Sequence, residues 1–234
     1  MPGFTFHPIA TIHSPFKEKF GVPRQSGVVT AAHSTIELLP PYNRPEAVEG
    51  LEGFSHLWLQ FIFHLNLRSE WQPMVRPPRL GGNKKVGVFA SRAPFRPNPI
   101  GLSAVKIESI QATQSAVCIE VSGADLVDGT PIIDIKPYIP YADSIPHASG
   151  GFAQTKPEPR FAVQFSAAAL QQLETLENGE ALQHMIQGVL AIDPRPAYRS
   201  DDSDHKEYGI LLDNFNIKWK VSGATIEVTT LIPV

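Results

Sequence analysis

The chain has 234 residues, of which 42% are hydrophobic and 18% are charged, and its formal net charge is −3. This balance excludes a disordered chain and argues against a protein that coats nucleic acid over its whole surface. No apolar run reaches the length of about eighteen residues that a membrane span needs, and the opening residues lack the charged and apolar segments of a secretory signal. The single cysteine, Cys118, lies in an apolar run and offers no disulfide framework, so we expect a buried, reduced thiol in a cytoplasmic protein.

Short apolar runs bounded by proline, glycine and asparagine dominate the first 150 residues. Runs of this length that are rich in valine, isoleucine and phenylalanine are typical of β-strands. Eight of them without a long helix between them favour an antiparallel barrel or sandwich, with one short helix around residues 44–51. The predicted strands lie within residues 6–12, 27–32, 35–39, 56–65, 86–90, 101–110, 115–121 and 131–135.

The pattern changes after a glycine- and proline-rich connector at residues 150–160. Phe161, Val163 and Phe165 alternate with polar residues, which predicts a strand. Apolar residues then recur at three-to-four spacing with an interruption at residues 178–179, and this predicts two amphipathic helices. Three strands follow, with turns at residues 213–214 and 222–223.

Several common catalytic signatures are missing from the sequence. There is no G-x-G-x-x-G after a strand and no G-x-x-x-x-G-K-[ST], which argues against a Rossmann site and a P-loop. There is no H-E-x-x-H, no cysteine and histidine set with zinc spacing, and no G-x-S-x-G. We therefore expect no metal site and no dinucleotide-binding helix.

Positive charge is concentrated in residues 71–107, which hold seven lysine and arginine residues and no acid. This segment is either an anion-binding face or a solvated basic loop that acids elsewhere balance. Three loops at strand ends, at residues 17–29, 91–101 and 125–144, add exposed backbone groups, arginines and carboxylates, a mixture that suits a nucleoside-type ligand. Alternatively, the D-G-T-P string is only a turn and the prolines only border edge strands.

Six strings carry a resemblance that covers nearly the whole chain. Residues 87–103 (GVFASRAPFRPNPIGLS) and 125–138 (DLVDGTPIIDIKPY), with the strings at 21–27, 50–64, 76–82 and 193–198, closely resemble the TsaA-like, or TrmO, family of bacterial tRNA methyltransferases. The resemblance implies transfer of a methyl group from S-adenosylmethionine to N6 of threonylcarbamoyladenosine at tRNA position 37, chiefly in threonine tRNA. It also implies a cofactor site on a small β-barrel and a homodimer with its cofactor sites near the subunit boundary.

The fold prediction follows from the strand pattern and this resemblance together. We expect a mainly β protein with an N-terminal antiparallel β-barrel at residues 1–150 that binds the cofactor. A smaller C-terminal α+β domain at residues 151–234 is expected to assist tRNA binding. The resemblance assigns the following residues to the cofactor: Ser26, Gly27, Val28, His64, Leu65, Arg92, Leu102, Gly129, Thr130, Pro131 and Ile132. Relatives often carry proline at the position of Ser26 and glutamine at that of Leu65, so we expect backbone contacts there.

Substrate contacts are expected from the stiff basic loop and from the second domain. The prolines around Arg92 restrict the unbound loop, so that Arg92 can meet a carboxylate of the cofactor or of the threonyl group. Arg96 is expected to contact phosphates of the anticodon stem-loop. Phe95, Tyr138 and Tyr141 are candidates for stacking on a splayed base. In the second domain, Arg195, Tyr198 and Arg199 are expected to touch tRNA, unless their segment only caps the helix that ends near residue 192.

No catalytic residue is fixed by the sequence. Asp128, Asp134 and His64 are candidate general bases, a tautomeric shift of the substrate is an alternative, and Asp134 has a competing role as a structural partner of Lys136 or Arg92. Two other classes of function stay open. One is a non-catalytic β-barrel module that binds a nucleotide or RNA as a regulator, and the other is a barrel enzyme that uses the same cofactor on a different substrate.

Overall fold

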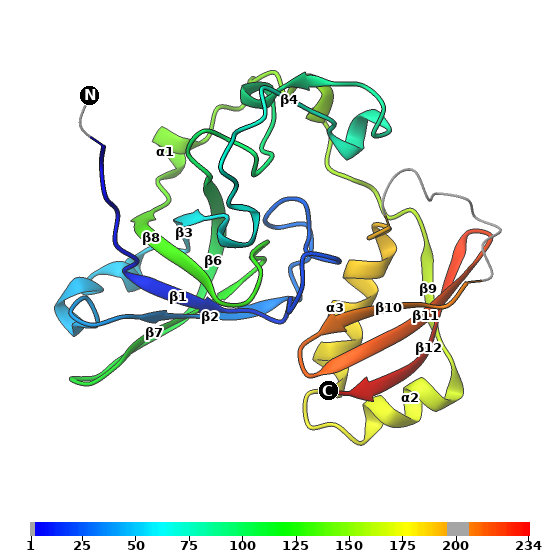
Figure 1. Cartoon of the computed structure of the whole chain (residues 1–234). Helices are drawn as coiled ribbons and strands as arrows, with labels where there is room; N and C mark the ends of the chain where they lie inside the picture. The colour runs from blue at the N-terminus through cyan, green and yellow to red at the C-terminus, as the bar shows by residue number, and fades with distance from the viewer. Residues whose placement is uncertain (1–2, 196–205) are drawn as a thin grey trace.

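The computed structural model describes residues 3–195 and 206–234 and contains a closed β-barrel beside a smaller α+β region (Figure 1). The mainly β fold class predicted from the sequence is therefore confirmed. In the part of the chain that the structure describes, no helix is long and apolar enough to cross a membrane.

Six strands form the barrel, and every neighbouring pair is antiparallel. Strand β3 illustrates how the strands build the core of the barrel. Leu57, Leu59 and Phe61 are buried while the residues between them are not, so one face of the strand packs into the core. In their order around the barrel the strands are β1 (Ala10–His13), β2 (His33–Leu38), β7 (Val117–Ser122), β6 (Ile100–Ala112), β3 (His56–Ile62) and β8 (Thr130–Pro137).

One close approach inside the barrel requires glycine. Gly101 on β6 lies opposite Phe61 on β3, and a Cβ atom on Gly101 would stand 2.2 Å from the Phe61 ring. The missing side chain thus leaves the space that the aromatic ring occupies.

Two predicted strands and the predicted helix of the first half differ from the structure. Residues 27–32 form turns, because Gly27 has a φ of +70° and Val29 packs away from the barrel, into the second core. Residues 86–90 contribute only β5 (Val86–Gly87), which pairs with β4 (Met74–Val75), and a 3₁₀ turn. The helix around residues 44–51 is replaced by two 3₁₀ turns, since Gly50 has a φ of +83° and so short a segment cannot offset the cost of helix nucleation. The short elements are η1 (Pro45–Ala47), η2 (Leu51–Gly53), η3 (His64–Asn66), η4 (Pro78–Leu80), η5 (Val88–Ala90), η6 (Gly151–Ala153) and α1 (Pro140–Asp143).

The C-terminal region follows the sequence prediction closely. Its sheet has the order β10-β11-β12-β9, with β9 parallel to β12 and the other pairs antiparallel. The two predicted helices are present, and Ser166 caps the first by accepting a hydrogen bond from the Ala169 backbone N–H. The elements are β9 (Ala162–Phe165), α2 (Ala167–Glu174), α3 (Gly179–Ala191), β10 (Tyr208–Leu212), β11 (Phe215–Ser222) and β12 (Thr225–Pro233).

The loop between β1 and β2 joins the two regions. Its residues Phe16, Val29 and Ala32 are buried in the C-terminal core rather than in the barrel. Phe16 forms an isolated β-bridge with Leu212, and the loop crosses from the barrel to the C-terminal region in Figure 1. The boundary at residue 150 stays a prediction, because a segment of the first predicted domain belongs to the second core.

Candidate cofactor site at one end of the barrel

A cleft of about 270 Å³ opens at the end of the barrel where β3 ends and β8 begins. Its walls are largely apolar, and a few polar side chains lie among them, as in many sites for small organic ligands. Of the residues assigned to the cofactor, His64, Leu65 and Thr130 line it. The complete lining is Lys19, Val22, Phe61, Ile62, Phe63, His64, Leu65, Asn66, Pro94, Asp125, Leu126, Val127 and Thr130.

The turn after β3 forms one wall of the cleft. The Phe63 backbone N–H donates to the Pro99 carbonyl and the Asn66 N–H donates to the Phe63 carbonyl, which fixes the turn against the start of β6. Partial burial lowers the pKa of His64, against an opposing hydrogen bond with the backbone of Ile62. His64 is therefore a neutral imidazole at ordinary pH, with a ring that can donate or accept one hydrogen bond.

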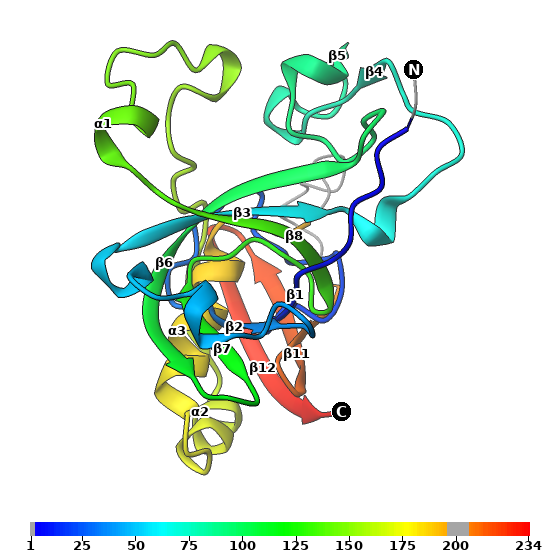
Figure 2. The ribbon, with the colours of Figure 1, turned by 90° about the vertical axis from the view of Figure 1, so that its left-hand side faces the viewer.

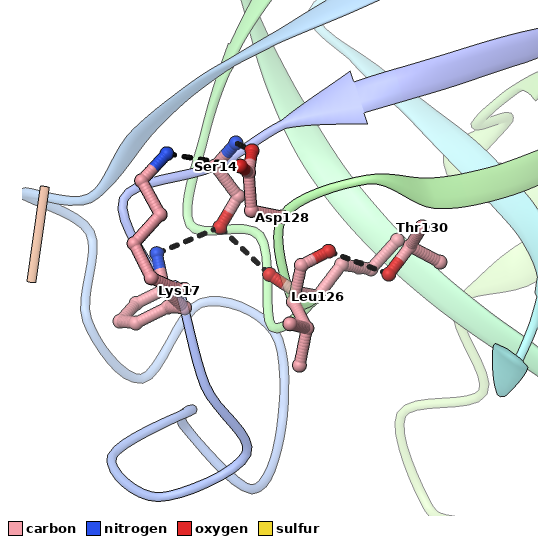
Figure 3. Close-up of polar contacts among 7 residues, drawn as sticks. Ser14, Lys17, Leu126, Asp128 and Thr130 are labelled. Carbon is pink, nitrogen blue, oxygen red and sulfur yellow. Dashed lines mark hydrogen bonds and ion pairs between the residues drawn. The ribbon is translucent and has the colours of Figure 1, made fainter. Parts of the chain in front are cut away.

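Residues 125–127, just before the D-G-T-P turn, and Thr130 within it form another wall of the cleft, and Asp128 holds the turn in place (Figure 3). Its carboxylate accepts a hydrogen bond from the Ser14 backbone N–H at 2.8 Å and pairs with Lys17 Nζ at 3.0 Å. Partial burial raises the pKa of Asp128, but these two contacts outweigh it and the net pKa is lowered. Asp128 is therefore an ionised clamp between the end of β1 and the turn, a poor candidate for a general base.

Asp134 also has a structural role. It lies on β8, outside the lining of the cleft, and pairs with Lys136 Nζ at 2.7 Å. Gln60 Nε2 donates to the same carboxylate at 3.3 Å. The alternative that Asp134 pairs with Lys136 is thus confirmed, and the structure does not bring Asp134 to the cleft.

The acid that does line the cleft is Asp125, which was not among the predicted bases. Burial raises its pKa to about 6, although a hydrogen bond from Ser103 Oγ at 2.5 Å and the nearby charge of Arg92 act in the opposite direction. The available sequence signal was its position, since Asp125 stands between Ala124 and Leu126, which are both buried. A carboxyl group that is buried in a cleft with a perturbed pKa is typical of a functional site.

The loop of residues 26–28 meets this carboxyl group from the barrel side. The Gly27 N–H donates to the Gly123 carbonyl at 2.9 Å, and the backbone of Ser26 is close enough to lower the pKa of Asp125. Arg92 donates from Nη1 to Gln25 Oε1 at 2.7 Å. The 26–28 loop and the arginine of the proline-rich loop therefore both approach the carboxyl group of Asp125, just before the D-G-T-P turn.

Other assigned cofactor residues are less directly placed. The Ile132 side chain is fully buried in the barrel core, so the predicted contact of Ile132 with a cofactor would come from its backbone. Leu102 is half exposed on β6 and, like Gly129 and Pro131, does not line the cleft. Contacts of these residues with a cofactor stay predictions.

The predicted tRNA residues of the barrel have mixed outcomes. Arg96 donates from Nη1 to the carbonyls of Val88 and Ser91 at 3.1 and 2.7 Å, so it braces the proline-rich loop from within, and its phosphate contact stays a prediction. Tyr138 packs on Trp58 beyond the far end of β8, and the structure does not bring it to the cleft.

Phe95 and Tyr141 are the two other predicted stacking partners for a tRNA base. Arg68 lies over the ring of Phe95 at 4.3 Å. Tyr141 is 91% exposed on α1.

The structure contradicts the predicted tRNA contact of Arg195. Its side chain is 0% exposed, and its guanidinium donates from Nε to Asp193 Oδ1 at 2.8 Å and from Nη2 to Asp193 Oδ2 at 3.1 Å. Arg160 shares the same carboxylate at 2.8 Å. The hydrogen bonds that Arg195 donates to Asp193 raise the pKa of Arg195, so a buried ion pair closes the turn after α3. Tyr198 and Arg199 lie outside the described residues.

Two predictions about cysteine and metal chemistry are resolved only in part. Cys118 on β7 is partly rather than fully buried, because its side chain faces outward between two core positions; this burial raises the pKa of the thiol. Among residues 3–195 and 206–234 there is no group of three side chains suited to hold a metal ion.

Fold and cleft together define a class of protein: a closed antiparallel barrel with a ligand-sized cleft at one end, where no α-helix of the described residues lines that cleft. Residues 11–144 match the N-terminal domain of tRNA-methyltransferase O, and residues 158–234 match the TrmO C-terminal domain. The chain therefore belongs to the tRNA-methyltransferase O family.

Individual relatives cover all or nearly all of the chain. It is 49% identical over 234 residues to the tRNA (adenine(37)-N6)-methyltransferase of Escherichia coli K12, and the match covers 100% of both chains. A Pseudomonas aeruginosa protein whose name describes an S-adenosylmethionine-dependent methyltransferase, RcsF, is 46% identical over 216 residues, which are 91% of this chain and 90% of that protein. A crystal structure of TrmO from Pseudomonas aeruginosa has a TM-score of 0.80 at 38% identity and covers 98% of each chain.

Proposed function

We propose that the protein is an S-adenosylmethionine-dependent methyltransferase that acts on N6 of adenosine 37 in tRNA. The finer proposal is that the adenosine already bears a threonylcarbamoyl group, chiefly in threonine tRNA, and that the enzyme works as a cytoplasmic homodimer. One observation carries the proposal: the 26–28 loop and Arg92, which the resemblance assigns to the cofactor, both approach the buried carboxyl group of Asp125, in a chain that matches an Escherichia coli relative over its whole length.

The cleft fits the proposed cofactor. Phe61, Phe63 and Leu126 would supply apolar walls for the aliphatic chain and the nucleoside of the cofactor, and Asp125 supplies a buried carboxylate among them. Arg92, held near Asp125 by Gln25, would bind the carboxylate of the methionine moiety. The bound cofactor would supply a methyl group made electrophilic by a sulfonium centre.

We assign Asp125 the task of accepting the proton that N6 loses when its new bond to carbon forms. Methyl transfer needs alignment of the two reactants, and the nitrogen gains reactivity when a base takes its proton. The pKa of Asp125, about 6, leaves the group ionised near neutral pH yet basic enough to accept a proton. Lys19, His64 and Arg92 are the other charged or titratable groups near it.

The test is transfer of a labelled methyl group to tRNA with and without the threonylcarbamoyl modification. We expect label in tRNA at adenosine 37 only with the modified substrate, and a loss of roughly a hundredfold or more in single-turnover rate for Asp125→Asn with cofactor affinity retained. Asp134→Asn is the matched control and should keep its rate. Label in unmodified tRNA would refute the finer substrate, and tRNA binding without any transfer would instead favour the regulatory module.

A further inference from the structure

Two large aromatic side chains stack on one another at the protein surface beside the cleft. Trp71 and Phe89 have ring centroids 6.1 Å apart with an angle of 23° between their planes. Trp71 is 47% exposed and Phe89 is 71% exposed. A stacked pair with open ring surface is a costly use of apolar area in a soluble protein unless something covers it.

The pair stands on a braced support. Trp71 lies just before β4, and Phe89 lies just after β5, the partner of β4. Val75 in β4 and Val88 directly after β5 are buried, and they anchor the paired strands. The Val88 N–H donates to the Pro73 carbonyl at 3.0 Å, and Arg96 Nη1 donates to the Val88 carbonyl at 3.1 Å. These hydrogen bonds hold the backbone that carries Trp71 and Phe89 in a fixed position.

The surroundings are basic and continuous with the candidate cofactor site. Residues 63–99, between β3 and β6, hold seven lysine and arginine residues and a single acid, Glu70. A second cavity, of about 260 Å³, includes Trp71 and Arg96 in its lining. It shares Asn66 and Pro94 with the cleft, so the two hollows adjoin.

We propose that Trp71 and Phe89 form a stacking platform for an unpaired base of the RNA loop that carries the target adenosine. Bases stack on exposed aromatic side chains without regard to sequence, and the positive charge of residues 63–99 attracts the phosphates on either side of the base. Its place next to the cleft suits a nucleotide adjacent to the one that enters the cleft. A second copy of this chain would also cover the two apolar rings, but the positive charge of residues 63–99 favours RNA, a polyanion, as the occupant.

This inference rests on the proposed function, and a binding experiment separates the two. The probe is an anticodon stem-loop RNA, and its affinity is measured for the unsubstituted protein, for Trp71→Ala with Phe89→Ala, and for Trp71→Phe. The platform predicts that the double substitution weakens binding of the stem-loop by about tenfold or more, while a fully paired RNA of equal length binds as before. Trp71→Phe keeps an aromatic ring and should bind nearly normally.

The matched control is Phe54→Ala, which removes another partly exposed aromatic ring just before the start of β3, whereas the β4–β5 unit follows the end of that strand (Figure 2). Its stem-loop affinity should not change. Equal loss for Phe54→Ala, or unchanged stem-loop affinity for the double variant, would overturn the platform. A double variant that changes oligomeric state without weakening RNA binding would instead identify a second copy as the occupant. If the proposed function failed, methyl transfer would be absent from the unsubstituted protein, whatever the binding result.

Discussion

Replacement of Asp125 by asparagine tests the electrostatics of the cleft through the stability of the fold. Burial raises the pKa of this carboxyl group from 3.8 to about 6. The folded protein therefore favours the protonated form. The stability that this form contributes is complete below about pH 3.8 and is lost as the pH rises through about 6.

The size of the effect follows from the two pKa values. Their difference corresponds to about 3 kcal/mol of unfolding free energy at about pH 8, and to roughly half of that at about pH 5, where only part of the loss has occurred. Asparagine has nearly the same shape, cannot ionise, and keeps an oxygen that accepts the hydrogen bond from Ser103. Asp125→Asn should therefore stabilise the protein, and by about 1.5 kcal/mol more at about pH 8 than at about pH 5.

Urea unfolding of both proteins at the two pH values measures this difference, with the slope of the transition as a check that the unfolded states match. Asp128→Asn is the control, because the pKa of Asp128 is lowered and its titration falls below both conditions. That variant should lose stability by the same amount at each pH. A pH-independent effect of Asp125→Asn would refute the burial of an ionising carboxyl group. A more stable protein that has lost methyl transfer would be the signature of a functional residue that strains the fold.

Two further predictions concern the cores. Gly101→Ala would place a Cβ atom 2.2 Å from the Phe61 ring and should cost about 1–3 kcal/mol in urea unfolding, whereas Gly53→Ala, with nothing within 4 Å, should cost far less. Asp193→Asn removes the carboxylate that neutralises the buried Arg195 and should cost about 3–5 kcal/mol. Loss of the exposed partner in Asp134→Asn should cost under about 1 kcal/mol, and equal costs would contradict the burial of the Asp193 pair.

Local sequence predicted those elements that local patterning determines. Strand β3 was found because its buried and open residues alternate, and helices α2 and α3 because their apolar residues recur on one face. The apolar run at residues 27–32 carries the same signal as a strand, yet Val29 and Ala32 are apolar because they enter the C-terminal core. Which core an apolar residue joins is a tertiary question that periodicity does not answer.

The candidate site shows the same limit for polar residues. Residues 125–138 read as one motif, but β8 (Thr130–Pro137) runs the length of the barrel wall and rises about 3.3 Å per residue. Asp125 and Thr130 therefore lie at the cleft, while Tyr138 lies near the other end, roughly 25 Å away. The predicted tRNA contact of Arg195 was wrong for a different reason. An arginine flanked by prolines suggests an exposed contact, and only the fold brings Arg160 and Asp193 together around it.

The buried Arg195 removes the simplest role for the C-terminal region, and the loop between β1 and β2 offers another. Phe16 and Val29, on either side of residues 26–28, are held in the C-terminal core. Glu18 accepts a hydrogen bond from the Leu211 backbone N–H at 3.0 Å, so the same loop is tied to β10. Because this loop also meets Asp125, the packing of the second core sets the position of one wall of the candidate site. The described residues of the C-terminal region thereby contribute to the cleft without placing a side chain in it.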